Sequence, residues 1–102
     1  MTRILTSHDI RVMRRNLIDS GIYCRVSTVL GRDAICLLLR DYRSYVPAGH
    51  SWLDVACHVI RDSVDGISMR YAGETNDNLS VLVVGFGDDV NRSLEDAMRR
   101  CC

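Results

Sequence analysis

Residues 34–40, AICLLLR, contain six consecutive apolar side chains followed by an arginine. In an extended strand, successive side chains point to opposite faces of the sheet, so this run is apolar on both faces. A strand of this kind is typical of the centre of a sheet, whereas an edge strand usually shows polar residues on one side. The sequence therefore predicts a central β-strand at residues 34–40.

Segments on either side of this run complete a set of four strands. Residues 22–30, IYCRVSTVL, alternate in polarity and precede a turn at 31–33, which predicts a hairpin with residues 34–40. Residues 67–71 alternate again, and residues 79–86, LSVLVVGF, are apolar and rich in β-branched side chains. We therefore expect a third and a fourth strand in the second half of the chain.

Three further segments show the spacing of amphipathic helices. The first begins with the capping-box pair Thr6 and Asp9, and a glycine ends it. The second begins with a similar pair, Ser51 and Asp54, and the third follows two aspartates that suit a helix N-terminus. The expected inward-facing residues are Ile10, Met13, Leu17 and Ile18, then Trp52, Ala56, Val59, Ile60 and Val64, and finally Val90, Leu94, Ala97, Met98 and Cys101.

These elements predict one α+β domain over residues 1–102, in the order α-β-β-α-β-β-α, with a four-stranded antiparallel sheet and three helices. The element order is similar to that of roadblock-type dimer modules, which carry one strand more. The simplest arrangement places the helices on one face of the sheet and leaves the other face uncovered. Because Val29, Leu82, Val84 and Phe86 add apolar surface at outer positions, we expect a homodimer that buries this face.

Composition excludes some kinds of chemistry. The chain has 13 basic and 13 acidic residues, and every basic residue is an arginine. Schiff-base and phosphate-loop lysine chemistry are therefore excluded. The 5 cysteines form no CxxC motif and no signal peptide is visible, which predicts free thiols in a reducing cytoplasm. No apolar run approaches the roughly 20 residues of a membrane-spanning helix.

One candidate metal site is Asp77-Asn78, within NDNLSVLVVGF at residues 76–86. This segment resembles the closing metal-binding strand of metal-dependent protein phosphatases of the PP2C type, and the resemblance implies that Asp77 helps to hold a divalent cation. The Asp-Gly-His-Gly segment of that family and its other metal aspartates are absent from this chain. One turn supplies too few oxygen ligands for such a metal, and Asn and Asp are common hairpin residues, so we prefer a hairpin turn.

A second candidate lies in the middle helix, where His50, Asp54 and His58 recur every four residues with Arg61 beyond them. Imidazole and carboxylate groups on one helix face are a ligand set for zinc, but the HExxH pattern is missing. Adjacent helix residues point about 100° apart, so Cys57 and His58 do not form a catalytic pair. A solvated helix face explains the same pattern, and we expect neither metal, cofactor nor catalytic residues here.

The segment RDYRSYVPAGH, residues 40–50, combines arginine and tyrosine, the residue types that often carry binding energy in protein interfaces. Its candidate partner-binding residues are Arg40, Tyr42, Arg43 and Tyr45. Three arginines of the first helix, Arg11, Arg14 and Arg15, extend this candidate surface. They could also contact nucleic acid, but the neutral chain has no excess of positive charge for phosphate binding.

The sequence thus favours a non-enzymatic, homodimeric protein-interaction module in the cytoplasm. An adaptor or an inhibitor of a larger protein machine, such as an anti-defence protein of a phage or mobile element, fits a chain of this size. The alternatives are a metal- or small-ligand-binding domain that uses His50, Asp54, His58 or Asp77, and a nucleic-acid-associated protein that uses the arginine-rich helix and loop.

Overall fold

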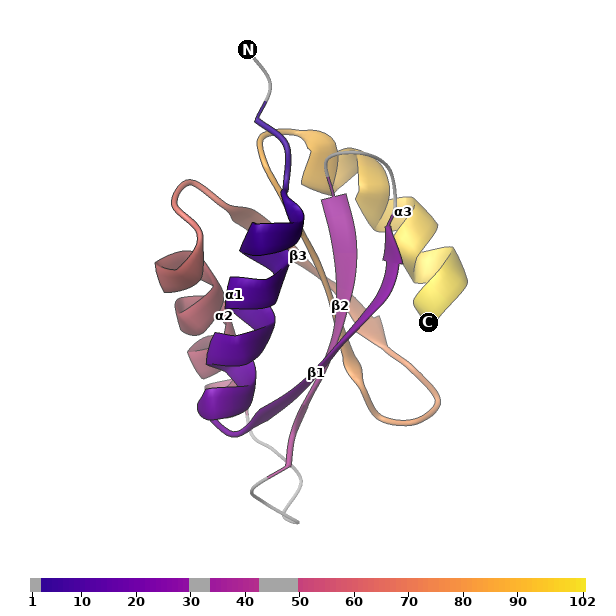
Figure 1. Ribbon diagram of the computed structural model, residues 1–102. Helices are drawn as coiled ribbons and strands as arrows, with labels where there is room; N and C mark the ends of the chain where they lie inside the picture. The colour runs from indigo at the N-terminus through magenta and orange to yellow at the C-terminus, as the bar shows by residue number, and fades with distance from the viewer. Residues whose placement is uncertain (1–2, 30–33, 43–49) are drawn as a thin grey trace.

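The computed structural model describes residues 3–29, 34–42 and 50–102, except for the side chains of Val29 and His50 (Figure 1). It contains the expected elements in the expected order, α-β-β-α-β-β-α, so the predicted fold class is confirmed. The elements are α1 (Ser7–Asp19), β1 (Ile22–Val29), β2 (Ala34–Asp41), α2 (His50–Ser63), β3 (Ser68–Glu74), β4 (Ser80–Gly85) and α3 (Asp89–Cys101).

The first helix follows the predicted capping signals. The side chain of Thr6 accepts a hydrogen bond from the backbone N–H of Asp9 at 3.1 Å, and the carboxylate of Asp9 accepts one from the backbone N–H of Thr6. This capping box satisfies two N–H groups that a helix start otherwise leaves without partners. The second helix begins at His50, one residue before Ser51, so the prediction that Ser51 caps it is wrong.

All four strands join one antiparallel sheet in the order β1-β2-β4-β3. β2 lies inside the sheet, as its apolar run predicts, and forms the expected hairpin with β1. Between β2 and β4 the register is regular, from Ala34 opposite Gly85 to Leu39 opposite Ser80. The hydrogen-bonded centre of the fold is therefore a pair of strands that come from different halves of the chain.

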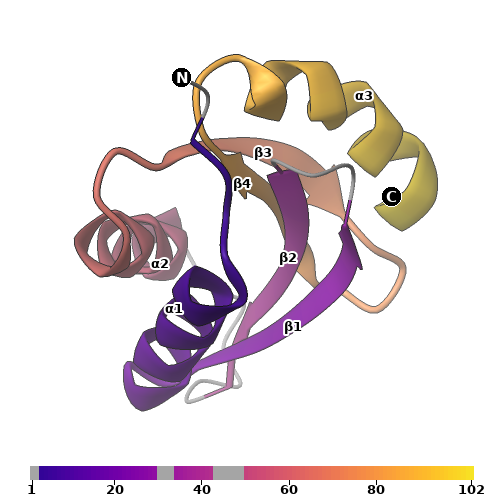
Figure 2. The ribbon, with the colours of Figure 1, turned by 45° about the horizontal axis from the view of Figure 1, so that its top comes forward.

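The helices lie on both faces of the sheet, with α1 and α2 on one side and α3 on the other (Figure 2). The expectation that all three helices cover one face is therefore wrong. Leu82, Val84 and Phe86, which we expected on an uncovered surface, are buried beneath α1 and α2. The reason lies in β2, where Ile35, Leu37 and Leu39 pack towards α1 and α2 while Cys36 and Leu38 pack towards α3.

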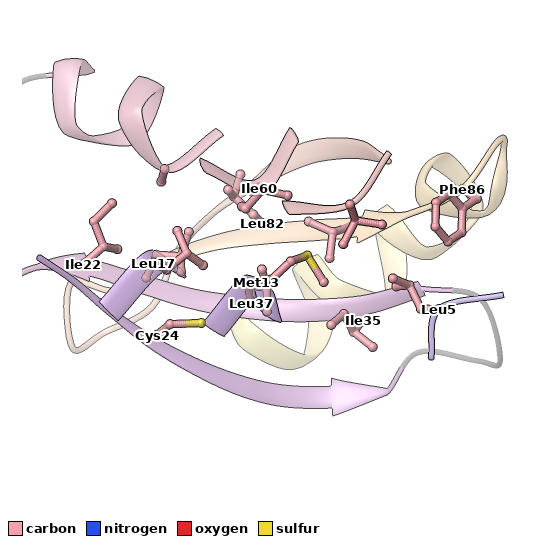
Figure 3. Packing of buried hydrophobic residues seen from close by; sticks show 14 residues of the cluster. Leu5, Met13, Leu17, Ile22, Cys24, Ile35, Leu37, Ile60, Leu82 and Phe86 are labelled. Carbon is pink, nitrogen blue, oxygen red and sulfur yellow. The ribbon is translucent and has the colours of Figure 1, made fainter. Parts of the chain in front are cut away.

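Figure 3 shows the core between the sheet and the α1/α2 layer, where Met13 and Leu17 of α1 meet Ile60 of α2 and Leu37 of the sheet. Each of these four side chains is fully buried. Ile18 does not join them, because its side chain is 44% exposed at the end of α1. The prediction of an inward-facing Ile18 is therefore wrong, and so is that of Met98, which is 51% exposed on α3.

The two edge strands are irregular. The register of β1 against β2 shifts between Val26 and Val29, and that of β3 against β4 shifts between Tyr71 and Gly73. Gly73 has a φ of +125°, a conformation that side-chain-bearing residues rarely adopt. Bulges of this kind twist a sheet edge and interrupt its pattern of free hydrogen-bonding groups, which hinders the addition of another strand.

Within the described ranges, no helix is both long enough and apolar enough to cross a membrane.

Candidate interaction surface

Asp77 and Asn78 lie in the turn between β3 and β4. The backbone N–H of Asn78 donates to the carbonyl of Thr75 at 3.0 Å, and the Thr75 hydroxyl accepts from the N–H groups of Asp77 and Leu79 at 3.2 Å each. Asn78 has a φ of +64°, which Asn tolerates better than most residues. The predicted hairpin is therefore confirmed, and hydrogen bonds within the turn explain its sequence.

Two of the three zinc candidates lie on the solvent side of α2. Asp54 and His58 are exposed one helical turn apart, and His50 is the first residue of the helix, although its side chain lies outside the described part of the structure. Among the described residues, no group of three or more His, Cys, Asp or Glu side chains has an arrangement that could hold a metal ion. Cys57 is half-buried while His58 is exposed, as expected for side chains that diverge.

The two described residues of the predicted partner-binding loop, Arg40 and Tyr42, lie on different sides of the sheet. The Arg40 guanidinium lies 5.3 Å from the ring centroid of Tyr23, a residue that packs against the α3 side of the sheet. Tyr42 lies on the other side, where its hydroxyl donates to the carbonyl of Ile18 in α1 at 3.0 Å. Arg43 and Tyr45 lie outside the described residues.

The three arginines of α1 are all exposed. Arg11 and Arg15 are one turn apart and so share one side of the helix, whereas Arg14 is close enough to Cys24 of β1 to lower the pKa of that thiol. Burial has the larger and opposite effect, and the pKa of Cys24 is raised to about 11. No salt bridge between described residues involves any of the three arginines.

A complementary set of side chains lies on α2. Asp54, His58 and Asp62 recur every four residues on the solvent side, and Val55, which is 42% exposed, lies beside them. Together with Val59 these residues line a shallow depression of about 340 Å³ whose lining is mostly apolar. Neither aspartate forms a salt bridge with another described residue.

We define the α1/α2 outer face as Arg11, Arg15 and Ile18 of α1 with Asp54, Val55, His58 and Asp62 of α2. The helices are neighbours in one layer, and the Asn16 side chain of α1 donates to the Ser63 hydroxyl of α2 at 2.8 Å. This outer face therefore combines exposed apolar groups with basic groups on one helix and acidic groups on the next. Sequence reasoning identified its arginines, but it considered Asp54 only as a metal ligand and assigned no role to Asp62.

A group of thiols also went unnoticed in the sequence. The Sγ atoms of Cys36 in β2 and Cys101 at the end of α3 are 3.7 Å apart, although 65 positions separate them in the chain. Burial and the neighbouring Cys101 raise the pKa of Cys36 to about 12. The spacing of cysteines in the sequence carries no signal for this contact, which depends on how α3 lies across the sheet.

A further depression of about 470 Å³ lies at the start of α3. Arg3 stacks over Phe86 there, with its guanidinium carbon 4.4 Å from the ring centroid, and also donates to the carbonyl of Asp65. The buried Asp89 is paired with Arg92 one turn along the helix. Because these polar groups already have partners within the chain, their arrangement explains how the N-terminal segment is held.

Comparison of the chain with known protein families, with curated proteins and with solved structures found no match.

Proposed function

We propose that this protein is a non-enzymatic interaction module that associates with a second copy of itself through the α1/α2 outer face. The observation that carries the proposal is the presence of exposed charges of opposite sign on two adjacent helices, with no salt bridge to another described residue. Charges of this kind on one surface are complementary to a second copy of the same surface.

A two-fold axis between the helices would place α1 of one copy over α2 of its partner, and the reverse contact would follow by symmetry. The sequence of α1 contains three arginines and two aspartates, a net charge of +1, while α2 contains one arginine and two aspartates, a net charge of −1. Ile18 and Val55 supply the apolar contacts that exposed charges alone do not provide.

The dimensions of this face predict a weak dimer. Helices of 13 and 14 residues are each roughly 20 Å long, and two side by side form a patch at or below the ~800 Å² per partner of a standard interface. We therefore expect a dissociation constant of about micromolar size that increases with salt concentration.

Such a self-associating module would serve as an adaptor or as an inhibitor of a larger protein assembly. We place its action in the cytosol, because the five cysteines are free and three of them are partly or fully exposed.

Charge reversal tests this proposal. One variant carries Arg11→Asp and Arg15→Asp, and the other carries Asp54→Arg and Asp62→Arg. Each variant alone should remain monomeric in sedimentation velocity, because like charges then face each other across the interface. An equimolar mixture should form a heterodimer, since both contacts become attractive again. Glu95→Arg, on the exposed side of α3, serves as the control and should dimerise like the unmodified protein.

A protein that remains monomeric at every concentration would contradict the proposal. So would a dimer that survives both charge reversals, because its interface would then lie elsewhere.

A further inference from the structure

Three cysteines meet where the end of α3 reaches the sheet. Cys101 of α3 is half-buried, and its Sγ lies 3.7 Å from Sγ of the buried Cys36 and 3.8 Å from the hydroxyl oxygen of Ser27. The exposed Cys102 donates from its thiol to the carbonyl of Ala72 at 3.2 Å. Two thiols from α3 and β2 are therefore already in van der Waals contact.

A disulfide requires the two sulfurs to approach to about 2.05 Å. Cys101 is the last residue of α3, and the final turn of a helix moves more easily than its middle. A small shift of this turn towards β2 is therefore sufficient. The neighbouring pair, Cys101 and Cys102, is less suitable, because consecutive Cα atoms are about 3.8 Å apart and disulfides usually need about 4.4–6.8 Å.

We propose that Cys36 and Cys101 form an oxidation-sensitive dithiol, which a hydroperoxide converts to a disulfide that fastens α3 to the central strand β2. The partly exposed Cys101 reacts first. Its thiolate attacks one peroxide oxygen and the O–O bond breaks. A sulfenic acid forms as the other oxygen leaves, as hydroxide from hydrogen peroxide or as alkoxide from an organic hydroperoxide, and takes up a proton.

The second step uses Cys36. Its sulfur attacks the sulfenic sulfur of Cys101, the S–S bond forms, and the S–O bond breaks with release of water, which carries away the Cys36 proton. The two thiols lose two electrons in total, and the peroxide gains them. Because burial raises the pKa of Cys36, we expect this step to accelerate as the pH increases.

The disulfide would close a long loop, since 65 positions separate its cysteines. Cross-links of this length restrict the unfolded chain strongly, so we expect oxidation to raise the Tm by roughly 10 °C or more. It should leave the proposed dimer unchanged, because α3 and the α1/α2 outer face lie on opposite sides of the sheet.

The experiment treats the reduced full-length protein with hydrogen peroxide, followed by intact mass spectrometry, non-reducing peptide mapping and calorimetry. The unmodified protein and Cys102→Ser should each lose the mass of two hydrogens, show a peptide that joins Cys36 to Cys101, and gain thermal stability that dithiothreitol reverses. Cys101→Ser and Cys36→Ala should show none of these changes. The Cys101 variant is informative even if Cys36→Ala folds poorly.

A disulfide that involves Cys102, a link between two chains, or oxidation of Cys101 to the sulfinic acid in place of a disulfide would each overturn the proposal. These results are independent of dimerisation, which sedimentation of the same samples measures separately.

Discussion

The two faces of the sheet are built from side chains of different size. The buried residues towards α1 and α2 include Met13, Leu17, Ile22, Leu37, Leu39, Ile60 and Leu82, whereas those towards α3 include Ala34, Cys36, Ala72, Val81, Val83 and Ala97. Two helices and large aliphatic side chains therefore cover one face, and a single helix on mostly small side chains covers the other. The difference suggests that the core between the sheet and α1/α2 supplies most of the hydrophobic stabilisation. The core between the sheet and α3 brings the thiols of Cys36 and Cys101 together.

Two neighbouring leucines of β2 test this division with the largest expected effect. Leu37→Ala should lower the free energy of unfolding by about 3–5 kcal/mol, because it leaves a cavity beneath two helices. Leu38→Ala, on the α3 side, should cost less, about 2 kcal/mol, because the thinner layer there can relax into the space more easily. Urea unfolding of both variants measures the difference. Equal losses would show that the two faces contribute alike.

The buried thiols, one on each face, provide a second test. The pKa of Cys24 is raised from 9.0 to about 11 and that of Cys36 to about 12. As the pH rises above about 9, the unfolded chain loses these protons before the folded protein does. The contribution of the two buried thiols to the free energy of unfolding is therefore fully present below this pH. Above it, the free energy of unfolding declines by up to about 1.4 kcal/mol per pH unit for each thiol.

Alanine variants separate the two contributions. The decline caused by Cys24 should end near pH 11, and that caused by Cys36 should continue to about pH 12. Urea unfolding across this window should therefore show a flatter pH dependence for Cys36→Ala than for Cys24→Ala. The opposite order would mean that Cys24 is the more strongly perturbed thiol.

The N-terminal caps of α1 and α3 give the smallest expected difference in the free energy of unfolding. Thr6 accepts a capping hydrogen bond, whereas Asp88, the residue before α3, makes no side-chain cap bond. Thr6→Ala should therefore cost about 1 kcal/mol, and Asp88→Ala only about 0.3 kcal/mol through the helix dipole. Thermal unfolding of both variants checks the order, and a larger loss for Asp88→Ala would contradict it.

Local sequence signals predicted the elements but not their layers. The capping box at Thr6, the alternation of β1 and the apolar run of β2 each depend on a few neighbouring residues, and each was confirmed. The apolar run at residues 34–39 also implies burial on both faces of β2. We expected a second copy of the chain to bury one of them, whereas α3 of the same chain covers it. The local pattern is the same in both cases, so it does not distinguish a dimer contact from a helix of the same chain.

The candidate surface was harder to predict, because it depends on tertiary position. Arg40 and Tyr42 are two residues apart and would share a face if the strand continued, but β2 ends at Asp41, and the hydroxyl of Tyr42 donates to the carbonyl of Ile18 in α1. The aspartates of α2 form a charged surface of mixed sign only because the arginines of α1 lie beside them. No local pattern in the sequence predicts that α1 and α2 are neighbours.

The bulges in β1 and β3 also bear on how the protein behaves when it is concentrated. Strand-by-strand growth into fibrils requires two straight edges with matching hydrogen-bonding groups, and both outer strands of this sheet depart from that geometry. Contact through helices, in contrast, ends with two chains when it follows a two-fold axis. If the protein associates as proposed, we therefore expect a concentrated solution to contain small assemblies and no fibrils, although nearly half of the residues are apolar and the net charge is zero.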